Sequence, residues 1–397
     1  MNIFAILLYI TFAIAAGIWI FHTVVIIGLV LARKKQHKLL KKEGTRKDLF
    51  VSVIIPARDE IENLPDIFSC LQVQSYINFE IILVNDRSRD GTDLLIENYA
   101  KQNPRIKVKT VHNHSDPGKL NPKQHALSLG IQAAEGEVLL FTDADCHIGP
   151  NWIKSIIPFY EQPDIGIVFS SVAAREEKGV LKKFQVFDHL FRYCYTDGAA
   201  GLGMPTGGFG NNLAIRRKTL EEIGGITNIP YSVTEDAALI ASVRERTNWK
   251  ILSNSAADSQ ILVRPQDTWT ALEYQEIRWN AGGLFSPDIT TRLAYSYVMY
   301  FLTVSVIALP FSLFYPIMLI YPATSFFTMC GIGLSSAVLS RKSLLYWLSV
   351  PLNVVIAMGF YSFVTIRTIF SQSVRWKGRT LQTHPLHGNA DTSTDKS

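Results

Sequence analysis

Cysteine pairs and phosphate-binding glycine motifs are missing from this sequence, and their absence narrows the possible functions. Its four cysteines are scattered, with no Cys-x-x-Cys pair: Cys70, Cys146, Cys194 and Cys330. This distribution argues against a disulfide framework or a cysteine-based metal site and fits a reducing compartment. No Gly-x-Gly-x-x-Gly motif follows the first predicted strand and no Gly-Lys-Ser/Thr motif occurs, which argues against a dinucleotide enzyme and a P-loop ATPase.

Charged residues are also scarce, at 18% of the chain, against the ~25% usual for soluble domains. Mean hydropathy is +0.14, and the apolar excess gathers at the two ends of the sequence. The middle, from Phe50 to Thr291, is long enough for one large domain with its own core. A net charge of +5 is a mild excess that does not indicate nucleic acid as a partner. The sequence therefore predicts a membrane protein with a soluble central domain.

The first apolar run covers residues 2–32, with His22 as its only ionisable side chain. It exceeds the ~20 residues needed to span a bilayer. A cleaved signal peptide would have a shorter apolar core with basic residues before it. Here the basic residues follow the run: Arg33, Lys34, Lys35, Lys38, Lys41 and Lys42. Because lysine and arginine mark the cytoplasmic side, we expect an anchor over 1–32 and a basic linker over 33–49 in a bacterial-type plasma membrane, with a cytoplasmic central domain.

The central domain alternates predicted strands and helices. The strands cover 51–56, 79–84, 106–111 and 139–141, and the helices cover 61–72, 93–101 and 121–135. This order predicts an α/β domain with a mostly parallel sheet. Acidic residues follow the strands, and parallel topology brings them to the sheet edge where ligands bind in such folds: Asp59, Glu60, Asp86, Asp143 and Asp145.

The sharpest motif is Asp143-Ala144-Asp145, directly after an apolar strand. In an extended chain the i, i+2 spacing places both carboxylates on one face, where they repel each other unless a cation joins them. Hard divalent ions such as Mg²⁺ and Mn²⁺ take oxygen ligands and share them with substrate phosphates. The alternative is a polar turn after a strand, since aspartate is common in turns.

Two later segments carry further candidates. A glycine-rich stretch over 198–210 permits close approach of a substrate, or is simply a mobile loop. Thr234-Glu235-Asp236 opens a predicted helix. Thr234 suits the N-cap position there, and first-turn acids suit the positive helix end. That capping role is the structural alternative to a catalytic one.

A predicted helix over residues 263–283 contains Gln275-Glu276-Ile277-Arg278-Trp279. Helical spacing places Gln275, Arg278 and Trp279 on one face. The alternative here is an amphipathic surface helix at the membrane.

The carboxyl-terminal region, 292–370, holds apolar runs sufficient for two spans over 295–339 and a third over 344–366. Two basic groups flank the last apolar run: Arg341-Lys342 before it, and Arg367, Arg375, Lys377 and Arg379 after it. They conflict under the positive-inside rule, because one full span between them would place the two groups on opposite sides of the membrane. A re-entrant piece near Pro351, or another division of the runs, would remove the conflict. The segment 371–397 is basic at first, and its composition predicts disorder from Pro385 onward.

As an ordered set, these motifs resemble those of the membrane-bound family 2 glycosyltransferases of the GT-A fold. The resemblance covers about Ser52 to Gly283. It rests on Ile54–Glu60 and Asn85–Thr92 for two nucleotide-binding loops, on Gly118-Lys119 with Ala126-Leu127, and on the three motifs ending at Asp145, Asp236 and Trp279. The lysine-to-alanine spacing departs from the family pattern, so either Lys119 or Lys123 meets the phosphates.

The resemblance implies an inverting hexosyltransferase that uses Mn²⁺ or Mg²⁺ and a UDP-sugar donor. It implies donor binding by Pro56, Glu60, Asp86, Lys119 and Asp143; metal binding by Asp145 with Asp143; a catalytic base, Asp236; and contacts to acceptor or diphosphate from Gln275, Arg278 and Trp279. Together with the membrane segments it predicts a lipid acceptor at the cytoplasmic face and a catalytic domain over 50–291. The alternatives are a processive polysaccharide synthase and, in a different class, a non-catalytic membrane scaffold or transporter.

Overall fold

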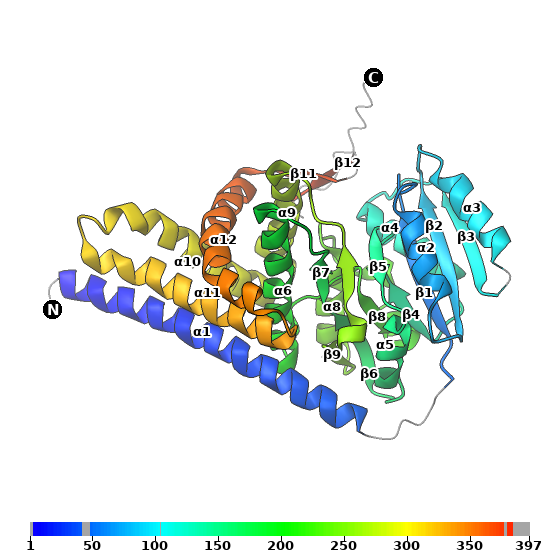
Figure 1. The fold of residues 1–397 in the computed structure, drawn as a ribbon, viewed down its shortest axis with the longest axis horizontal. Helices are drawn as coiled ribbons and strands as arrows, with labels where there is room; N and C mark the ends of the chain where they lie inside the picture. Colours follow the sequence, from blue (N-terminus) through cyan, green and yellow to red (C-terminus); the bar gives the residue numbers. More distant parts are fainter. Residues whose placement is uncertain (1–2, 42–47, 104, 377–378, 384–397) are drawn as a thin grey trace.

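The computed structural model describes residues 3–41, 48–103, 105–376 and 379–383. It has two parts, an α/β domain and a group of long helices beside it (Figure 1). The tail predicted to be disordered from Pro385, and the basic residues Lys42 and Lys377, lie outside the described residues.

The α/β domain is built on a seven-stranded sheet in the order β3-β2-β1-β4-β8-β6-β9. The strands are β1 (Val51–Ala57), β2 (Phe79–Asp86), β3 (Lys107–Asn113), β4 (Val138–Phe141), β6 (Ile165–Ser170), β8 (Leu213–Arg216) and β9 (Lys250–Asn254). Only β8 runs antiparallel to its neighbours, β4 and β6. The predicted α/β fold with a mostly parallel sheet is therefore confirmed.

Helices cover both faces of this sheet because its strands are apolar on both sides. They are α2 (Leu64–Gln72), α3 (Thr92–Gln102), α4 (Pro122–Ala133), α5 (Trp152–Tyr160), α7 (Arg217–Glu222) and α8 (Glu235–Arg246). Two large apolar clusters, one on each face, form the core of the domain. A second small sheet in the order β5-β10-β7 contains β5 (Cys146–Ile148), β7 (Val172–Ala174) and β10 (Ile261–Val263).

Six long helices lie on the other side of the molecule: α1 (Ile3–Leu40), α6 (Val180–Gly201), α9 (Trp269–Leu284), α10 (Ile289–Phe311), α11 (Ile320–Leu339) and α12 (Leu344–Phe370). Short 3-10 turns occur over Ile226–Asn228, Ala257–Ser259 and Pro316–Leu319. In Figure 1 α6 and α9 lie between the sheet and the remaining helices, and α1, α10 and α11 extend away from it side by side. Four helices, α1, α10, α11 and α12, are long and apolar enough to cross a membrane.

The amino-terminal helix packs closely against α6. It continues through the basic residues to Leu40. A Cβ atom on Gly28 would lie 2.2 Å from the carbonyl oxygen of Gly198 in α6, and one on Gly201 would lie 1.9 Å from the carbonyl oxygen of Gly28. Only glycine permits this approach of the two backbones. Lys35 Nζ then donates to the Gly201 carbonyl at 2.7 Å, so the basic segment also holds the helix in place.

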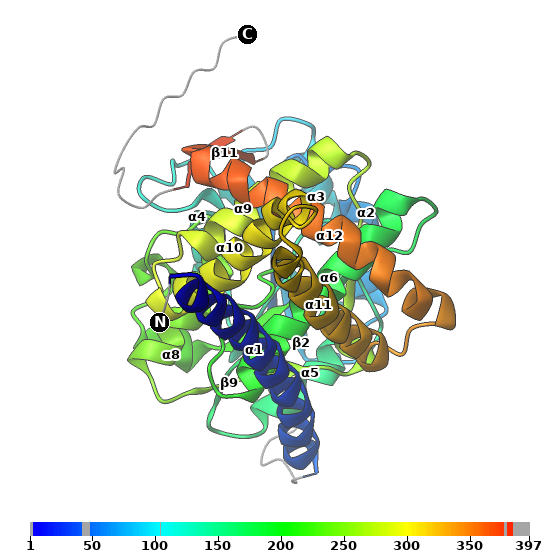
Figure 2. The same ribbon diagram turned by 90° about the vertical axis from the view of Figure 1, so that its left-hand side faces the viewer.

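Both ends of the last long helix, α12, make ion pairs with other elements. Lys342, just before it, pairs with Glu176 at 2.6 Å, and Arg367 in its last turn pairs with Glu273 of α9 at 3.2 Å. It is continuous through Pro351 and runs across α10 and α11 (Figure 2). The break that would resolve the charge conflict at Pro351 is therefore not present in this helix.

A hairpin of β11 (Ser373–Trp376) and β12 (Arg379–Gln382) follows α12. Val374 and Leu381 pack against Val233 and against Ile277 of α9. The Tyr231 hydroxyl donates to the Gln382 carbonyl at 3.3 Å. The hairpin thereby reaches from the membrane helices to the sheet edge where β1, β2 and β4 end (Figure 1).

Candidate active site

The loops after β1 and β2 are tied together at the sheet edge. The Asp59 carboxylate accepts from the Arg89 amide at 2.8 Å, and the Glu60 amide donates to Thr92 Oγ1 at 2.8 Å. Asp59 and Arg87 both have positive φ angles, 52° and 58°. Such angles cost energy in residues with a Cβ, and strain of this kind is concentrated at functional sites.

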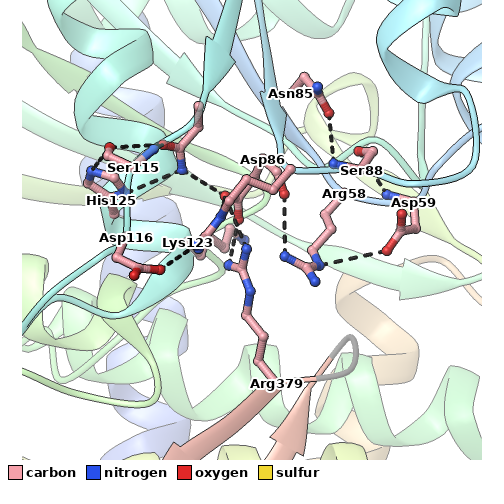
Figure 3. A network of polar contacts seen from close by, with 12 residues as sticks. Arg58, Asp59, Asn85, Asp86, Ser88, Ser115, Asp116, Lys123, His125 and Arg379 are labelled. Carbon is pink, nitrogen blue, oxygen red and sulfur yellow. Dashed lines mark hydrogen bonds and ion pairs between the residues drawn. The ribbon is translucent and has the colours of Figure 1, made fainter. Parts of the chain in front are cut away.

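Asp86, the last residue of β2, is the most enclosed acid of this edge. Its side chain is only 5% exposed. Asn113 Nδ2 donates to its Oδ1 at 2.8 Å, and the Arg379 guanidinium approaches both oxygens (Figure 3). Arg58 donates to its backbone carbonyl at 3.4 Å. Burial and the nearby Arg379 charge lower the pKa of Arg58, in that order.

Asp143 and Asp145 follow β4, as predicted, and a lysine contacts the first of them. Lys123 Nζ lies 2.7 Å from Asp143 Oδ1 and 3.4 Å from Glu235 Oε1. Burial and the charge of Asp143 raise the pKa of the Asp145 carboxyl to about 6. Burial opposes the charge of Lys123, but the surrounding acids prevail and raise the pKa of its ammonium.

The position of Lys123 follows from a well-defined helix start. Asn121 accepts from the Lys123 amide at 2.9 Å and Gln124 closes the capping box, with a proline in the first turn. This combination strongly favours a helix beginning here and fixes the lysine in its first turn. Lys119 precedes the helix; it is exposed and lies outside the cavity that holds the other predicted residues.

Asp236 lies in the first turn of α8, and the backbone holds both its oxygens. The amide of Gly210 donates to Oδ2 at 2.7 Å and that of Ala237 to Oδ1 at 2.9 Å. A Cβ on Gly210 would lie 3.0 Å from Asp236 Cβ, so a side chain there would crowd the Asp236 carboxylate. Burial and the neighbouring Glu235 raise the pKa of Asp236 to about 6. Thr234 occupies the N-cap position as expected, but its side chain makes no capping hydrogen bond in the described structure.

The glycine-rich stretch is not one loop. Its first members, Gly198 and Gly201, belong to the end of α6, where they contact α1. Only the segment after Gly203 is loop, and it places Gly210 against Asp236. Close approach of backbones accounts for Gly198 and Gly201, and a positive φ of 80° accounts for Gly203.

The face of α9 that carries Gln275, Arg278 and Trp279 lies toward the same site as Asp236. Arg278 Nη1 donates to the Val233 carbonyl at 3.5 Å. Trp279 packs edge-on against His189 of α6, and the Arg192 guanidinium lies 5.4 Å from its ring centre. Gln275 Oε1 is buried and has no hydrogen-bond partner among the described residues.

Two residues around Trp279 escaped the sequence interpretation. Arg192 pairs with Asp188 at 2.8 Å and with Glu276 of α9, and Asp188 also accepts from Tyr361 of α12. This buried cluster joins α6, α9 and α12. The sequence signal for Asp188 and Arg192 was their spacing of four residues within a largely aromatic and aliphatic helix. No comparable pattern surrounds Arg379 in the sequence.

One large cavity, of about 1140 Å³, collects the predicted site residues. The sequence offered eleven candidate residues when both Lys119 and Lys123 are counted. All but Lys119 line the polar end of the cavity: Pro56, Glu60, Asp86, Lys123, Asp143, Asp145, Asp236, Gln275, Arg278 and Trp279. Its other end lies among the long helices and is lined by apolar side chains: Ile18, Phe21, Val25, Val298, Phe301, Leu302 and Met329. The cavity therefore joins the acidic residues at the sheet edge to an apolar compartment among the long helices.

A family comparison matches this architecture over almost the whole chain. The model for "Glycosyl transferase family 21" covers residues 17–387. The chain belongs to glycosyl transferase family 21. This family assignment confirms the expected glycosyltransferase with flanking apolar helices.

The curated relatives of this family 21 enzyme are distant. Beta-monoglucosyldiacylglycerol synthase of Trichormus variabilis is 22% identical over 71% of this chain and 60% of its own length. Poly-beta-1,6-N-acetyl-D-glucosamine synthase of Staphylococcus epidermidis is 25% identical over 66% of this chain and 63% of its own length. The chain thus spans less than two thirds of either relative.

Among solved structures, the mannosyltransferase PcManGT from Pyrobaculum calidifontis, in complex with GDP-Man and Mn²⁺, has a TM-score of 0.52 at 16% identity. The match covers 90% of this chain and 98% of that chain. It supports a shared GT-A fold, including the long apolar helices.

The chemistry of the acids fits a hard divalent cation. Asp143 and Asp145 present oxygen ligands at one strand end, and burial together with the charge of Asp143 raises the pKa of Asp145. A bound cation would offset both effects. Lys123 pairs with Asp143, so Asp145 would be the more available ligand for such a cation.

Proposed function

We propose that this family 21 enzyme transfers a sugar, with inversion, from a UDP-sugar to the hydroxyl group of a membrane lipid at the cytoplasmic face. The observation that carries the proposal is the single cavity running from the acids at the sheet edge into the long helices. A water-soluble acceptor needs no such apolar extension. The distant relative that makes a glucosyldiacylglycerol supports the same acceptor class.

The apolar end of the cavity suits a hydrocarbon chain. It is bounded by α1, α10 and α11, which are long enough to span the bilayer. Each methylene moved from water into such a space contributes ~0.8 kcal/mol, but a lipid already in the membrane gains little from this transfer. The compartment therefore serves mainly to orient the acceptor, directing its polar head toward Asp236.

We place the nucleotide-sugar donor at the polar end of the cavity because of the charged residues there. Asp86 and Glu60 orient the nucleoside, and Lys123 and Arg278 supply positive charge to the diphosphate. We assign the phosphate-binding role to Lys123 rather than Lys119, because only Lys123 lies in the cavity. Asp145, with Asp143, would hold Mn²⁺ or Mg²⁺, which supplies charge neutralisation for the departing diphosphate.

Asp236 acts as the general base. Two backbone amides fix its carboxylate, and a pKa of about 6 leaves it largely ionised yet more basic than an exposed aspartate at neutral pH. It removes the proton of the acceptor hydroxyl as the oxygen attacks the anomeric carbon and the diphosphate leaves. One base and one displacement give inversion without a covalent sugar–enzyme intermediate. Trp279 offers a flat apolar surface for a sugar ring.

A processive polysaccharide synthase is the second candidate, since one relative makes poly-N-acetylglucosamine. A polymer channel would be lined by polar groups along its length. The membrane end of the cavity is instead dominated by aliphatic and aromatic side chains. This difference favours a single transfer to a lipid.

The test fills the apolar compartment without touching the donor site. Val298→Trp on α10 places a large ring in the cavity, while Leu293→Trp is the matched control, because Leu293 is 63% exposed on the same helix and does not line the cavity. We expect Val298→Trp to lower transfer to extracted lipids at least tenfold with unchanged Mn²⁺-dependent UDP-sugar hydrolysis, measured by mass spectrometry of the lipid product. Equal glycolipid formation by both variants would refute the acceptor assignment, and failure of the wild-type protein to hydrolyse any UDP-sugar would refute the donor assignment.

A further inference from the structure

Arg379 of β12 lies directly on the acid assigned to the nucleoside. Its Nη1 is 2.7 Å from Asp86 Oδ2 and its Nη2 is 3.3 Å from Asp86 Oδ1. The Arg379 and Asp86 side chains are 14% and 5% exposed. Figure 3 shows the guanidinium approaching Asp86 from the hairpin, from the opposite direction to β2. The two residues are 293 positions apart in sequence.

The hairpin that carries Arg379 is anchored elsewhere. Its apolar residues Val374 and Leu381 pack on α9 and on the segment before α8. At its base, Thr383 closes the turn back to the end of α12, its amide donating to the Gln372 carbonyl at 3.1 Å. Its ion pair with Asp86 joins it to β2. Val374 and Leu381 take no part in that pair, so Arg379 can leave Asp86 while they keep their packing.

The carboxylate of Asp86 is already engaged on both oxygens. Asn113 and Arg379 both donate to Oδ1, Arg379 also donates to Oδ2, and Arg87 Nε lies 3.6 Å from Oδ1. A nucleobase N–H that reaches this carboxylate from the cavity would compete with these donors. Asn113 belongs to β3 of the sheet, and Arg87 is adjacent in sequence. Arg379 is the donor supplied by a separate element.

We propose that Arg379 is a latch on the donor site: it occupies Asp86 in the free enzyme, and the base of the incoming nucleotide displaces it. The inference rests on the proposed role of Asp86 in binding the nucleoside. Release of Arg379 removes the tie between β12 and Asp86, while Val374 and Leu381 keep their packing on α9 and Val233.

Uridine is the best probe, because it carries the base but no phosphate that Arg379 could bind afterwards. The variants are Arg379→Gln, Arg379→Lys and the control Arg367→Gln, which removes a positive charge from the same end of α12 but pairs with Glu273 outside the site. Uridine affinity is measured by ligand-observed NMR on the full-length protein in detergent, and UDP affinity with Mn²⁺ by calorimetry.

We expect Arg379→Gln to bind uridine about tenfold more tightly than wild type, since a charge-assisted pair no longer has to be broken. Arg379→Lys, which keeps the charge but not the two-point geometry, should fall between, and Arg367→Gln should match wild type. In the wild-type protein, saturating uridine should speed amide exchange of residues 373–382.

Unchanged or weaker uridine binding by Arg379→Gln, in a protein that still binds UDP with Mn²⁺, would overturn the latch and leave the donor site standing. Amide exchange of the hairpin that does not respond to uridine would overturn it independently of any substitution. If neither wild type nor variants bind UDP, the proposed function fails first and the latch fails with it.

Discussion

Replacing Glu235 by glutamine should shift the acidic limb of the pH–rate profile to lower pH. Burial is the largest cause that raises the pKa of Asp236 to about 6, and the charge of Glu235 is the next. A general base works only when ionised, so kcat rises with pH through this pKa. Removing the negative charge of Glu235 removes one cause of the rise. Glutamine keeps the size of the side chain at this buried position.

The size of the shift follows from the neighbouring charge. A like charge this close changes a pKa by roughly one unit. If the pKa of Asp236 falls from about 6 to about 5, its ionised fraction at pH 5 rises from ~9% to ~50%. At pH 5, kcat relative to its plateau should therefore increase about fivefold, with little change above pH 8.

The assay is steady-state transfer at saturating UDP-sugar and lipid. It must be repeated at two Mn²⁺ concentrations, because the pKa of Asp145 is also raised to about 6. A limb caused by protonation of a metal ligand moves with Mn²⁺ concentration, whereas a limb caused by Asp236 does not. A limb that stays in place in Glu235→Gln, or moves to higher pH, would refute the reasoning about which charges set this pKa.

Four further predictions concern the same site and its orientation. Asp145→Ala should abolish transfer and weaken Mn²⁺-dependent UDP binding in calorimetry, with thermal unfolding little changed; unaltered affinity would contradict the metal assignment. Asp236→Asn should lower kcat ~10²–10⁴-fold with nearly unchanged UDP affinity, and an α-linked donor should give a β-linked product by NMR; an α product is incompatible with single displacement. Lys123→Met should destabilise the metal-free protein by about 2–3 kcal/mol, below the ~3–5 kcal/mol of a fully buried pair because Asp143 is 30% exposed, and Mn²⁺ should restore more stability to the variant than to wild type in thermal scans. Protease added to right-side-out vesicles should leave residues 50–291 uncut; cleavage there would place the catalytic domain outside.

Local patterns were sufficient to predict the sheet edge. The acids after β1, β2 and β4 follow apolar strands, and parallel topology requires their ends to meet. The same reasoning placed Asp236 at a helix start. These predictions succeeded because each depends on residues close in sequence, with the topology supplying the rest.

Contacts between distant segments could not be predicted in this way. Nothing near Arg379 in sequence indicates that it reaches Asp86, because the approach depends on how α12 crosses the molecule. The direction of α12 is likewise set by its packing on α9 and α10, whereas its composition alone is that of a spanning helix. The predicted helix start at Asn121 was correct, but the choice of Lys123 over Lys119 depended on which side chain reaches the cavity, and the sequence does not show this.

The backbone contact between Gly28 and α6 bears on how the enzyme can be engineered. An anchor that merely tethers can be exchanged for any hydrophobic helix. Here a side chain at position 28 or 201 would push the two helices apart, and α1 also forms a wall of the cavity. A soluble truncation, or a chimera with a foreign amino-terminal segment, would therefore lose part of the acceptor compartment along with its attachment. Under the proposed function the membrane segment is therefore part of the acceptor compartment, and at position 28 its packing against α6 admits only glycine.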